Sequence, residues 1–378
     1  MCPHRSWSVV VLAAVIGLAF PAASSAAKPT TTAAVRGGLE RLVAAKGGPP
    51  GAIATLHRRG RTTVVRAGFG NVRTRRAPRA DDRMRIASVA KAFSGALALR
   101  LVQDGRLGLD DTIGARLPDV PAAWAGVTVR QLLNHTSGIP DYTRSEGFAE
   151  QFRTDPRGYV APGTIVDWVR SDGLRFAAGS RYEYSNTDNI LVGLIAERVT
   201  GRPYGDLLSS NVFKPAGLRH TTFPSTFELR APFIHGYVVA PRAQPQDVST
   251  FLSPSGAWAS GAIVSTPAEM GRFMRANLGR RFFGAAQQRQ QLRFVSGASS
   301  PPGPGRNAAG LAIFRYRTRC GTVYGHTGSF PGYAQWVAAT ADGRRSVTTT
   351  LNIPPPSGAL LRRLRAVQTT AVCALLEK

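Results

Sequence analysis

Lysine is scarce in this chain of 378 residues. Nearly all of its 48 basic residues are arginines, and the five lysines are Lys28, Lys46, Lys91, Lys214 and Lys378. An arginine guanidinium does not lose its proton in proteins, whereas a desolvated lysine can. Any catalytic amine must therefore come from one of these five positions.

Other absences exclude whole classes of site. There is no H-E-x-x-H motif and no cysteine cluster, so we expect no metal and no cofactor. There is no G-x-S-x-G elbow, which disfavours a Ser-His-Asp hydrolase. After residue 27 no apolar segment reaches the roughly 20 residues of a membrane span, so we expect no stable span after signal cleavage.

Acidic residues are also few, which gives a formal net charge of +26. Proteins that bind nucleic acid concentrate their basic residues in a stripe, whereas these arginines are scattered along the chain. We attribute the bias to genome composition and expect no nucleic-acid partner. Attraction to anionic cell-wall polymers stays open.

The N-terminus is typical of an export signal. Arg5 precedes an apolar stretch over Val9–Phe20, and small residues over Ala22–Ala27 offer a cleavage site. We expect residues 1–27 to be a signal peptide and the protein to be secreted or cell-wall associated; an uncleaved anchor is the alternative. In an oxidising compartment the two remaining cysteines, Cys320 and Cys373, favour one disulfide over two free buried thiols.

Strand and helix patterns divide the chain into three parts. Two strands over residues 51–57 and 62–69 suggest a hairpin, and strand patterns return over 311–319, 333–340 and 346–351. From residue 110 to about 220 the pattern is helical. We predict an α+β fold with an antiparallel sheet from both terminal segments (28–109 plus 225–378), flanking helices, and an inserted all-α subdomain (110–224).

Ser88 and Lys91 form an S-x-x-K pair at the start of an apolar helical run. Positions i and i+3 share a helix face, so the lysine amine can approach the serine hydroxyl and accept its proton. The spacing alone is weak, because Ser25 and Lys28 match it within the expected signal region.

Two further motifs make the pattern specific. Tyr184-Ser185-Asn186 precedes a helix, and His326-Thr327-Gly328 lies between two strand signals. In this order the three motifs resemble the serine β-lactamase and penicillin-binding superfamily, whose pattern is S-x-x-K, S-D-N and K-T-G. The tyrosine resembles the class C-like branch, and the histidine resembles secreted D-alanyl-D-alanine carboxypeptidases. The resemblance covers about residues 35–375 by the domain-size argument.

The resemblance implies a role for each residue. Ser88 is the nucleophile, and either Lys91 or Tyr184 is the general base. The backbone N–H groups of Ser88 and Ser329 form the oxyanion hole. Asn186 contacts the substrate amide and Lys91, and the substrate is also bound by Thr327, Gly328 and Trp258, although Trp258 could equally be a core residue.

Three residues carry more specific expectations. The resemblance implies that His326, which replaces a lysine, is a catalytic residue, either in the proton network of Tyr184 or facing the substrate carboxylate. Its ordinary pKa of about 6.5 predicts pH dependence near neutrality. A terminal carboxylate needs a cation, for which Arg315 is the candidate unless Phe314 occupies that slot. We interpret His135 as structural.

The leading functional interpretation is a secreted serine D-Ala-D-Ala carboxypeptidase. It would act on peptidoglycan stem peptides through a Ser88 acyl-enzyme, and β-lactams would acylate the same serine. Alternatives are a class C-like β-lactamase, an esterase or D-aminopeptidase of the same fold, and a non-catalytic wall-binding module. We expect a monomer.

Overall fold

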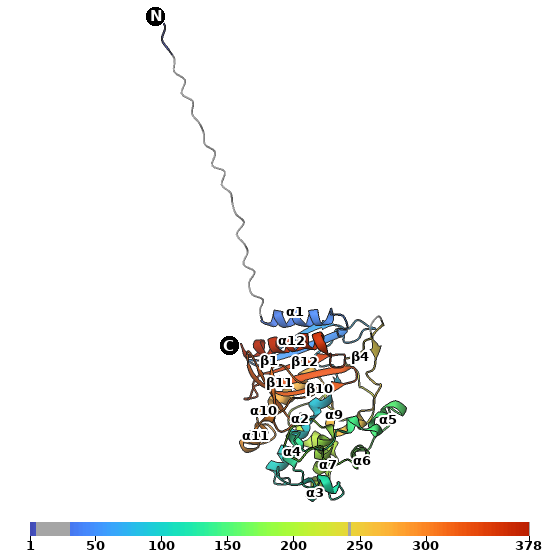
Figure 1. The fold of residues 1–378 in the computed structure, drawn as a ribbon. Coiled ribbons are helices and arrows are strands. Elements are labelled where there is room, and N and C mark those ends of the chain that lie inside the picture. Colours follow the sequence, from blue (N-terminus) through green and yellow to red (C-terminus); the bar gives the residue numbers. More distant parts are fainter. Residues whose placement is uncertain (5–30, 241–242, 378) are drawn as a thin grey trace.

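The computed structural model describes residues 1–4, 31–240 and 243–377 (Figure 1). The expected signal peptide and the Ser25–Lys28 pair lie essentially outside these residues. Within the described residues no helix is both long and apolar enough to cross a bilayer.

An eight-stranded antiparallel sheet forms the centre of the fold, in the order β2-β1-β12-β11-β10-β9-β8-β7. Its strands are β1 (Gly51–Arg58), β2 (Arg61–Gly68), β7 (Val295–Ser296), β8 (Arg306–Ala309), β9 (Phe314–Thr318), β10 (Gly321–Phe330), β11 (Tyr333–Ala339) and β12 (Ser346–Leu351). The first strand pairs directly with the last, with Ala52 opposite Leu351 and His57 opposite Ser346. The predicted α+β fold, with a sheet built from both ends of the chain, is confirmed.

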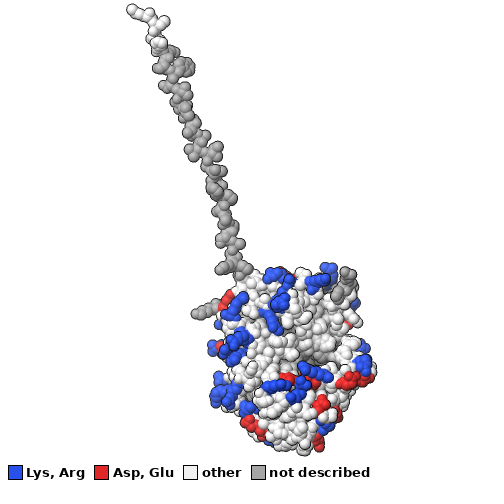
Figure 2. Space-filling model, viewed as in Figure 1, with Lys and Arg blue, Asp and Glu red and all other residues white. Residues whose placement is uncertain are grey.

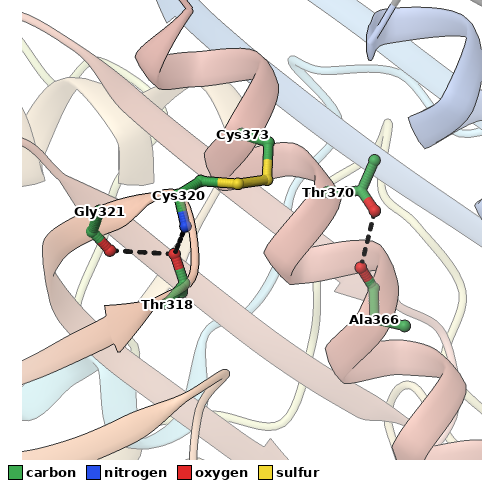
Figure 3. Close-up of a disulfide and its surroundings, with 6 residues drawn as sticks. All are labelled: Thr318, Cys320, Gly321, Ala366, Thr370 and Cys373. Atoms are coloured by element: carbon green, nitrogen blue, oxygen red, sulfur yellow. Dashed lines mark hydrogen bonds between the residues drawn. A yellow bond between two sulfur atoms is a disulfide. The ribbon is translucent and has the colours of Figure 1, made fainter.

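Two terminal helices, α1 (Thr31–Val43) and α12 (Gly358–Leu376), lie side by side on one face of the sheet (Figure 1). Their apolar stripes bury Val35, Leu39, Val367 and Leu375 against the strands. The predicted disulfide is present: Cys320, in the turn between β9 and β10, is bonded to Cys373 of α12 (Figure 3). It ties this helix to the sheet.

The other face of the sheet carries a larger apolar core and the helical part of the chain. Its elements are α2 (Ala90–Gln103), α3 (Ile113–Arg116), α4 (Val129–Leu133), α5 (Glu146–Thr154), α6 (Pro162–Asp167), α7 (Asn186–Thr200), α8 (Tyr204–Leu208), α9 (Trp258–Gly261), α10 (Pro267–Leu278) and α11 (Ala285–Gln291), with the short helical turns η1 (Ala87–Val89), η2 (Ala122–Trp124), η3 (Tyr142–Arg144), η4 (Ser209–Phe213) and η5 (Pro254–Gly256) and the two-residue strands β3 (Met84–Arg85), β4 (Tyr237–Val238), β5 (Gln246–Asp247) and β6 (Val264–Ser265).

Helices α2 and α7 are buried on nearly all sides. Their own apolar residues are spread around the whole helix and do not form one stripe. Helix α2 stops at Gln103 and α7 ends where Gly201 adopts φ 66°. The first motif runs from η1 into the start of α2, the second runs into the start of α7, and β10 holds the third.

Charge is distributed unevenly over the visible surface (Figure 2). Arginine and lysine side chains are spread over this face without forming a stripe, while most acidic side chains in this view lie at the lower, helical end.

Candidate active site

Ser88 and Lys91 meet at the start of α2. Ser88 lies in η1, Lys91 follows in the first turn of α2, and the Lys91 Nζ lies 3.2 Å from the Ser88 Oγ. The amine also lies 2.7 Å from Asn186 Oδ1 and 2.8 Å from the Ser260 carbonyl oxygen. A neutral amine has two N–H donors and one lone pair. Two acceptors that cannot themselves donate therefore leave the lone pair for the Ser88 hydroxyl proton.

Burial lowers the pKa of Lys91 towards the range that a general base needs. Lys91 is fully buried, and desolvation lowers its pKa to about 7, although the nearby carboxyl groups of Asp141 and Asp188 oppose the shift. At neutral pH a substantial fraction of the amine is therefore uncharged. Lys91 thus meets both requirements of a general base, contact and available lone pair.

Tyr184 precedes α7 and lines the same cavity as Ser88. Its hydroxyl is buried and makes no hydrogen bond of ordinary geometry, while its ring packs on His135 with centroids 4.4 Å apart. Desolvation raises the pKa of Tyr184 well above its ordinary value, although the adjacent Ser88 side chain opposes the rise. The phenol therefore keeps its proton, which favours Lys91 over Tyr184 as the base.

The sequence suggested that His326 lies between two strands. In the structure it lies inside the single strand β10. Its Nδ1–H donates to the Thr327 carbonyl oxygen at 2.5 Å, and its Nε2 is buried without a partner. Desolvation is the main cause that lowers the pKa of His326 to about 3. The expectation that His326 titrates near neutrality is wrong, because a buried imidazole loses its charge long before that range.

The third motif places β10 directly against the nucleophile. A Cβ on Gly328 would lie 2.4 Å from the Ile86 carbonyl oxygen and 3.3 Å from the Ser88 nitrogen, so only glycine allows this approach. The next residue, Ser329, lines the same cavity as Ser88. Thr327 is turned elsewhere, since its hydroxyl donates to the Pro301 carbonyl oxygen at 2.7 Å. Neither Thr327 nor Gly328 lines the cavity above Ser88.

Asn186 connects Lys91 to a carboxylate that the sequence analysis missed. Its Nδ2 donates to the two oxygens of Asp141 at 3.2 and 3.0 Å. The loop is held by Thr187, whose hydroxyl donates to the Pro140 carbonyl oxygen and accepts from the Tyr142 backbone N–H. No motif spacing marks Asp141, because only these hydrogen bonds between segments far apart in the chain bring it to the site.

His135 lies beneath Tyr184 and not in the cavity. Its Nδ1 lies 2.8 Å from Asp188 Oδ2, and both side chains are buried. Ser137 donates a second hydrogen bond to the same carboxyl group. Desolvation lowers the pKa of His135 and raises that of Asp188. This arrangement agrees with the structural interpretation of His135, since its ring supports the tyrosine.

The cavity above Ser88 has a volume of about 480 Å³. Much of its wall is aromatic or aliphatic: Tyr142, Phe148, Phe152, Val160, Trp168, Leu252 and Phe330. Among the described residues that line it, the charged ones are Asp141, Arg144 and Asp155. No group of described His, Cys, Asp and Glu residues is arranged to hold a metal ion.

Two sequence candidates lie away from this cavity. Trp258 packs in the core, with ring centroids 5.0 Å from Tyr204 and 6.4 Å from Phe223, and is not among the lining residues. The structure therefore favours the core alternative. Arg315 stacks on Phe294 at 4.7 Å, while Phe314 packs on His326. Neither residue supplies a cation to the cavity.

This geometry agrees with a match to a known family. Residues 35–370 match the Beta-lactamase family, so the chain belongs to it, with a class C-like serine hydrolase fold.

Solved structures of similar proteins cover nearly the whole fold. A D-stereospecific amidohydrolase from Streptomyces sp. is 32% identical with TM-score 0.77, covering 85% of this chain and 94% of that chain. A D-amino acid amidase from Ochrobactrum anthropi SV3, complexed with L-phenylalanine amide, is 27% identical with TM-score 0.77, covering 91% and 97%. The chain thus belongs to this family, and these similar proteins differ in the substrates that their names give.

Penicillin-binding protein 4* of Bacillus subtilis (strain 168) is 26% identical over 295 residues, which is 74% of this chain and 63% of that protein. Protein flp of Staphylococcus aureus (strain MW2) is 31% identical over 186 residues, 48% of this chain and 36% of that protein. The chain therefore spans less than two thirds of the length of these curated relatives.

Proposed function

We propose that this protein hydrolyses amide bonds of D-amino acid derivatives, either amides or short peptides, through an acyl-enzyme on Ser88. The observation that carries the proposal is the hydrogen bonding of Lys91, whose two acceptors leave its lone pair for the serine. The preference for D-amino acids rests on the similarity to the amidohydrolase and the amidase.

The chemical steps follow from the protonation states. Neutral Lys91 takes the Ser88 proton as the Oγ attacks the substrate carbonyl carbon, and the backbone N–H groups of Ser88 and Ser329 hold the resulting oxyanion. Tyr184, still protonated, donates its proton to the leaving nitrogen as the C–N bond breaks, and Lys91 reprotonates the tyrosine. Water then attacks the ester carbonyl carbon and gives a proton to neutral Lys91. As the bond from this carbon to Ser88 Oγ breaks, Lys91 passes that proton to the Oγ, so the acid is released and the Ser88 hydroxyl is restored.

The second candidate is the D-Ala-D-Ala carboxypeptidase expected from the sequence. The His326-Thr327-Gly328 motif and the similarity to penicillin-binding protein 4* support it. A carboxypeptidase must bind a terminal carboxylate, and Arg144 is the one basic residue among the described residues that line the cavity. Arg144 is exposed at the rim, so this candidate has weaker support than an amidase that needs no such cation.

One experiment separates these candidates. The mature protein and Ser88→Ala are incubated with D-phenylalanine amide, a D-Ala-D-Ala peptide and benzylpenicillin, and products and intact protein mass are followed. We expect release of ammonia from the amide by the wild type alone. Faster release of D-alanine from the peptide would favour the carboxypeptidase, and rapid penicillin turnover the β-lactamase. Equal activity of wild type and Ser88→Ala would remove Ser88 from the nucleophile role.

Secretion with removal of residues 1–27 remains part of the proposal. N-terminal sequencing of protein recovered from culture medium tests it. A mature chain that starts near residue 28 is expected, whereas an intact N-terminus in the membrane fraction would contradict it.

A further inference from the structure

The cavity above Ser88 has two chemically different walls. One presents the Asp141 carboxylate next to Asn186. The other presents the aromatic rings of Tyr142 in η3, of Phe148 and Phe152 in α5, and of Trp168, which directly follows α6. A volume of about 480 Å³ is at the small end for ligand sites, enough for one or two residues of a substrate. The two walls can therefore bind two parts of the same small molecule.

Asp141 has negative charge to offer a ligand. Its Oδ1 accepts from Asn186, the Thr143 backbone N–H and the Thr143 hydroxyl, whereas its Oδ2 accepts from Asn186 Nδ2. Within the described part of the chain it makes no ion pair. It is connected to Lys91 only indirectly, because the Asn186 amide hydrogen-bonds both to Asp141 and to the Lys91 amine. Lys91 must be neutral to act as a base, and in that state no cation among the described residues forms an ion pair with the carboxylate, although the exposed Arg144 lines the same cavity.

The aromatic side chains of this wall pack against one another and leave the cavity in front of them open. Helix α5 places Phe148 and Phe152 on one face at i and i+4, while no residue of α5 is fully buried. Phe148 packs at ring-centroid distances of 5.6 Å from Tyr142 and 6.0 Å from Trp168. A Cβ on Gly147 would lie 2.2 Å from the Trp168 ring, so glycine lets the helix approach closely. The rings thus form a fixed surface with open space in front of it.

We propose, resting on the function proposed above, that the acyl part of the substrate is an amino-terminal residue with a free ammonium group and a large apolar side chain. Asp141 binds the ammonium group and the rings of Phe148, Phe152 and Trp168 receive the side chain. The enzyme would therefore cleave after the first residue, as an aminopeptidase or amidase does, and would not trim carboxyl ends.

The test compares three chromogenic substrates at pH 7: D-phenylalanine p-nitroanilide, its N-acetyl derivative, and D-alanine p-nitroanilide. At this pH most α-amino groups, with a pKa of about 7.7–8.0, carry a proton. We expect the wild type to prefer the free amine over the N-acetyl substrate by at least about tenfold in kcat/KM, the effect of one charge-assisted contact. We expect a preference of similar size for phenylalanine over alanine, by the area that the ring buries.

Three variants locate these preferences. Asp141→Asn keeps an acceptor for Thr143 but removes the charge, and should bring the free-amine to N-acetyl ratio close to one. Phe152→Ala should lower the phenylalanine to alanine ratio by about tenfold through lost apolar contact. Glu150→Gln is the matched control, because it removes the same charge from the outward face of α5, and should keep both ratios.

A fluorophosphonate probe, which needs neither an amine nor a side chain, reports on Ser88 in every variant. An equal loss of activity of Asp141→Asn on both phenylalanine substrates would overturn the inference, because it would show a role through Lys91 only. A wild type that hydrolyses free and blocked substrates equally would overturn it as well. If the probe labels Ser88 but no D-amino acid anilide is hydrolysed, the proposed function itself fails and the inference fails with it.

Discussion

The burial of Lys91 predicts a specific pH dependence of acylation. If the neutral amine is the base, kcat/KM should rise with pH through a single ionisation near 7 and then level off. Since desolvation lowers the lysine pKa from 10.5 to about 7, the midpoint lies far below that of an ordinary lysine. At one pH unit below the midpoint about one tenth of the amine is neutral, so the rate at pH 6 should be about one tenth of the plateau.

The same shift affects stability. Each pKa unit corresponds to about 1.4 kcal/mol, so holding a charged Lys91 in this site costs about 5 kcal/mol. Because the folded-state pKa is lowered, the cost is fully present below pH 7, where both states bind the proton. Between about pH 7 and 10.5 the unfolded chain binds one more proton than the folded chain, so stability rises with pH. Lys91→Met should lack this contribution.

The assay measures kcat/KM for N-acetyl-D-phenylalanine p-nitroanilide, which has no titrating amine, from pH 5 to 9, with urea unfolding of the wild type and Lys91→Met from pH 6 to 10. His326→Gln serves as a control, because burial keeps the imidazole neutral over this range. Its midpoint should stay where the wild-type midpoint lies, whatever its rate. A flat profile, or a midpoint near 10 in the wild type, would refute the assignment of Lys91 as the base.

Three further variants test parts of the site and fold. Gly328→Ala should lower kcat by about 100-fold in a folded protein, because its Cβ would lie 2.4 Å from a backbone oxygen and displace the nucleophile; unchanged kcat with unchanged circular dichroism would contradict this. Tyr184→Phe keeps the ring packing but removes the acid, so acylation should fall by about 10²–10⁴ without loss of thermal stability, since the hydroxyl is buried and unpartnered; near-normal turnover would exclude the phenol as proton donor. Replacing Cys320 and Cys373 by serine opens a loop with a sequence separation of 53 and should cost about 4 kcal/mol of unfolding free energy, measured by urea denaturation; an unchanged midpoint would show that the bond adds no constraint.

The strands and helices that were predictable are those with local signals. The hairpin of β1 and β2 and the strands β11 and β12 follow from alternation and turn residues, and they lie within a few residues of the predicted ranges. Strand β10 was missed as a strand through His326, because Gly325 and Gly328 interrupt its strand pattern and glycine has low strand propensity. It is held in the sheet by pairing with β9 and β11 instead.

The residues of the site also divide into those that sequence spacing could place and those that it could not. Sequence spacing placed Lys91 beside Ser88, since an i, i+3 pair at a helix start needs no other part of the chain. It could not place Asp141, which reaches Asn186 through hydrogen bonds from Thr187. It also left Trp258 open between a substrate contact and a core residue, whereas packing on Tyr204 and Phe223 favours the core.

Residue type and short-range order are enough to predict the family resemblance, the α+β architecture, the serine with its lysine, and the cysteine pair. The protonation states, the charge and shape of the cavity, and the carboxylate that lines it follow from the folded structure. These depend on burial and on contacts between segments far apart in the chain, such as Asp141 and Asn186 with a sequence separation of 45, which no local pattern encodes.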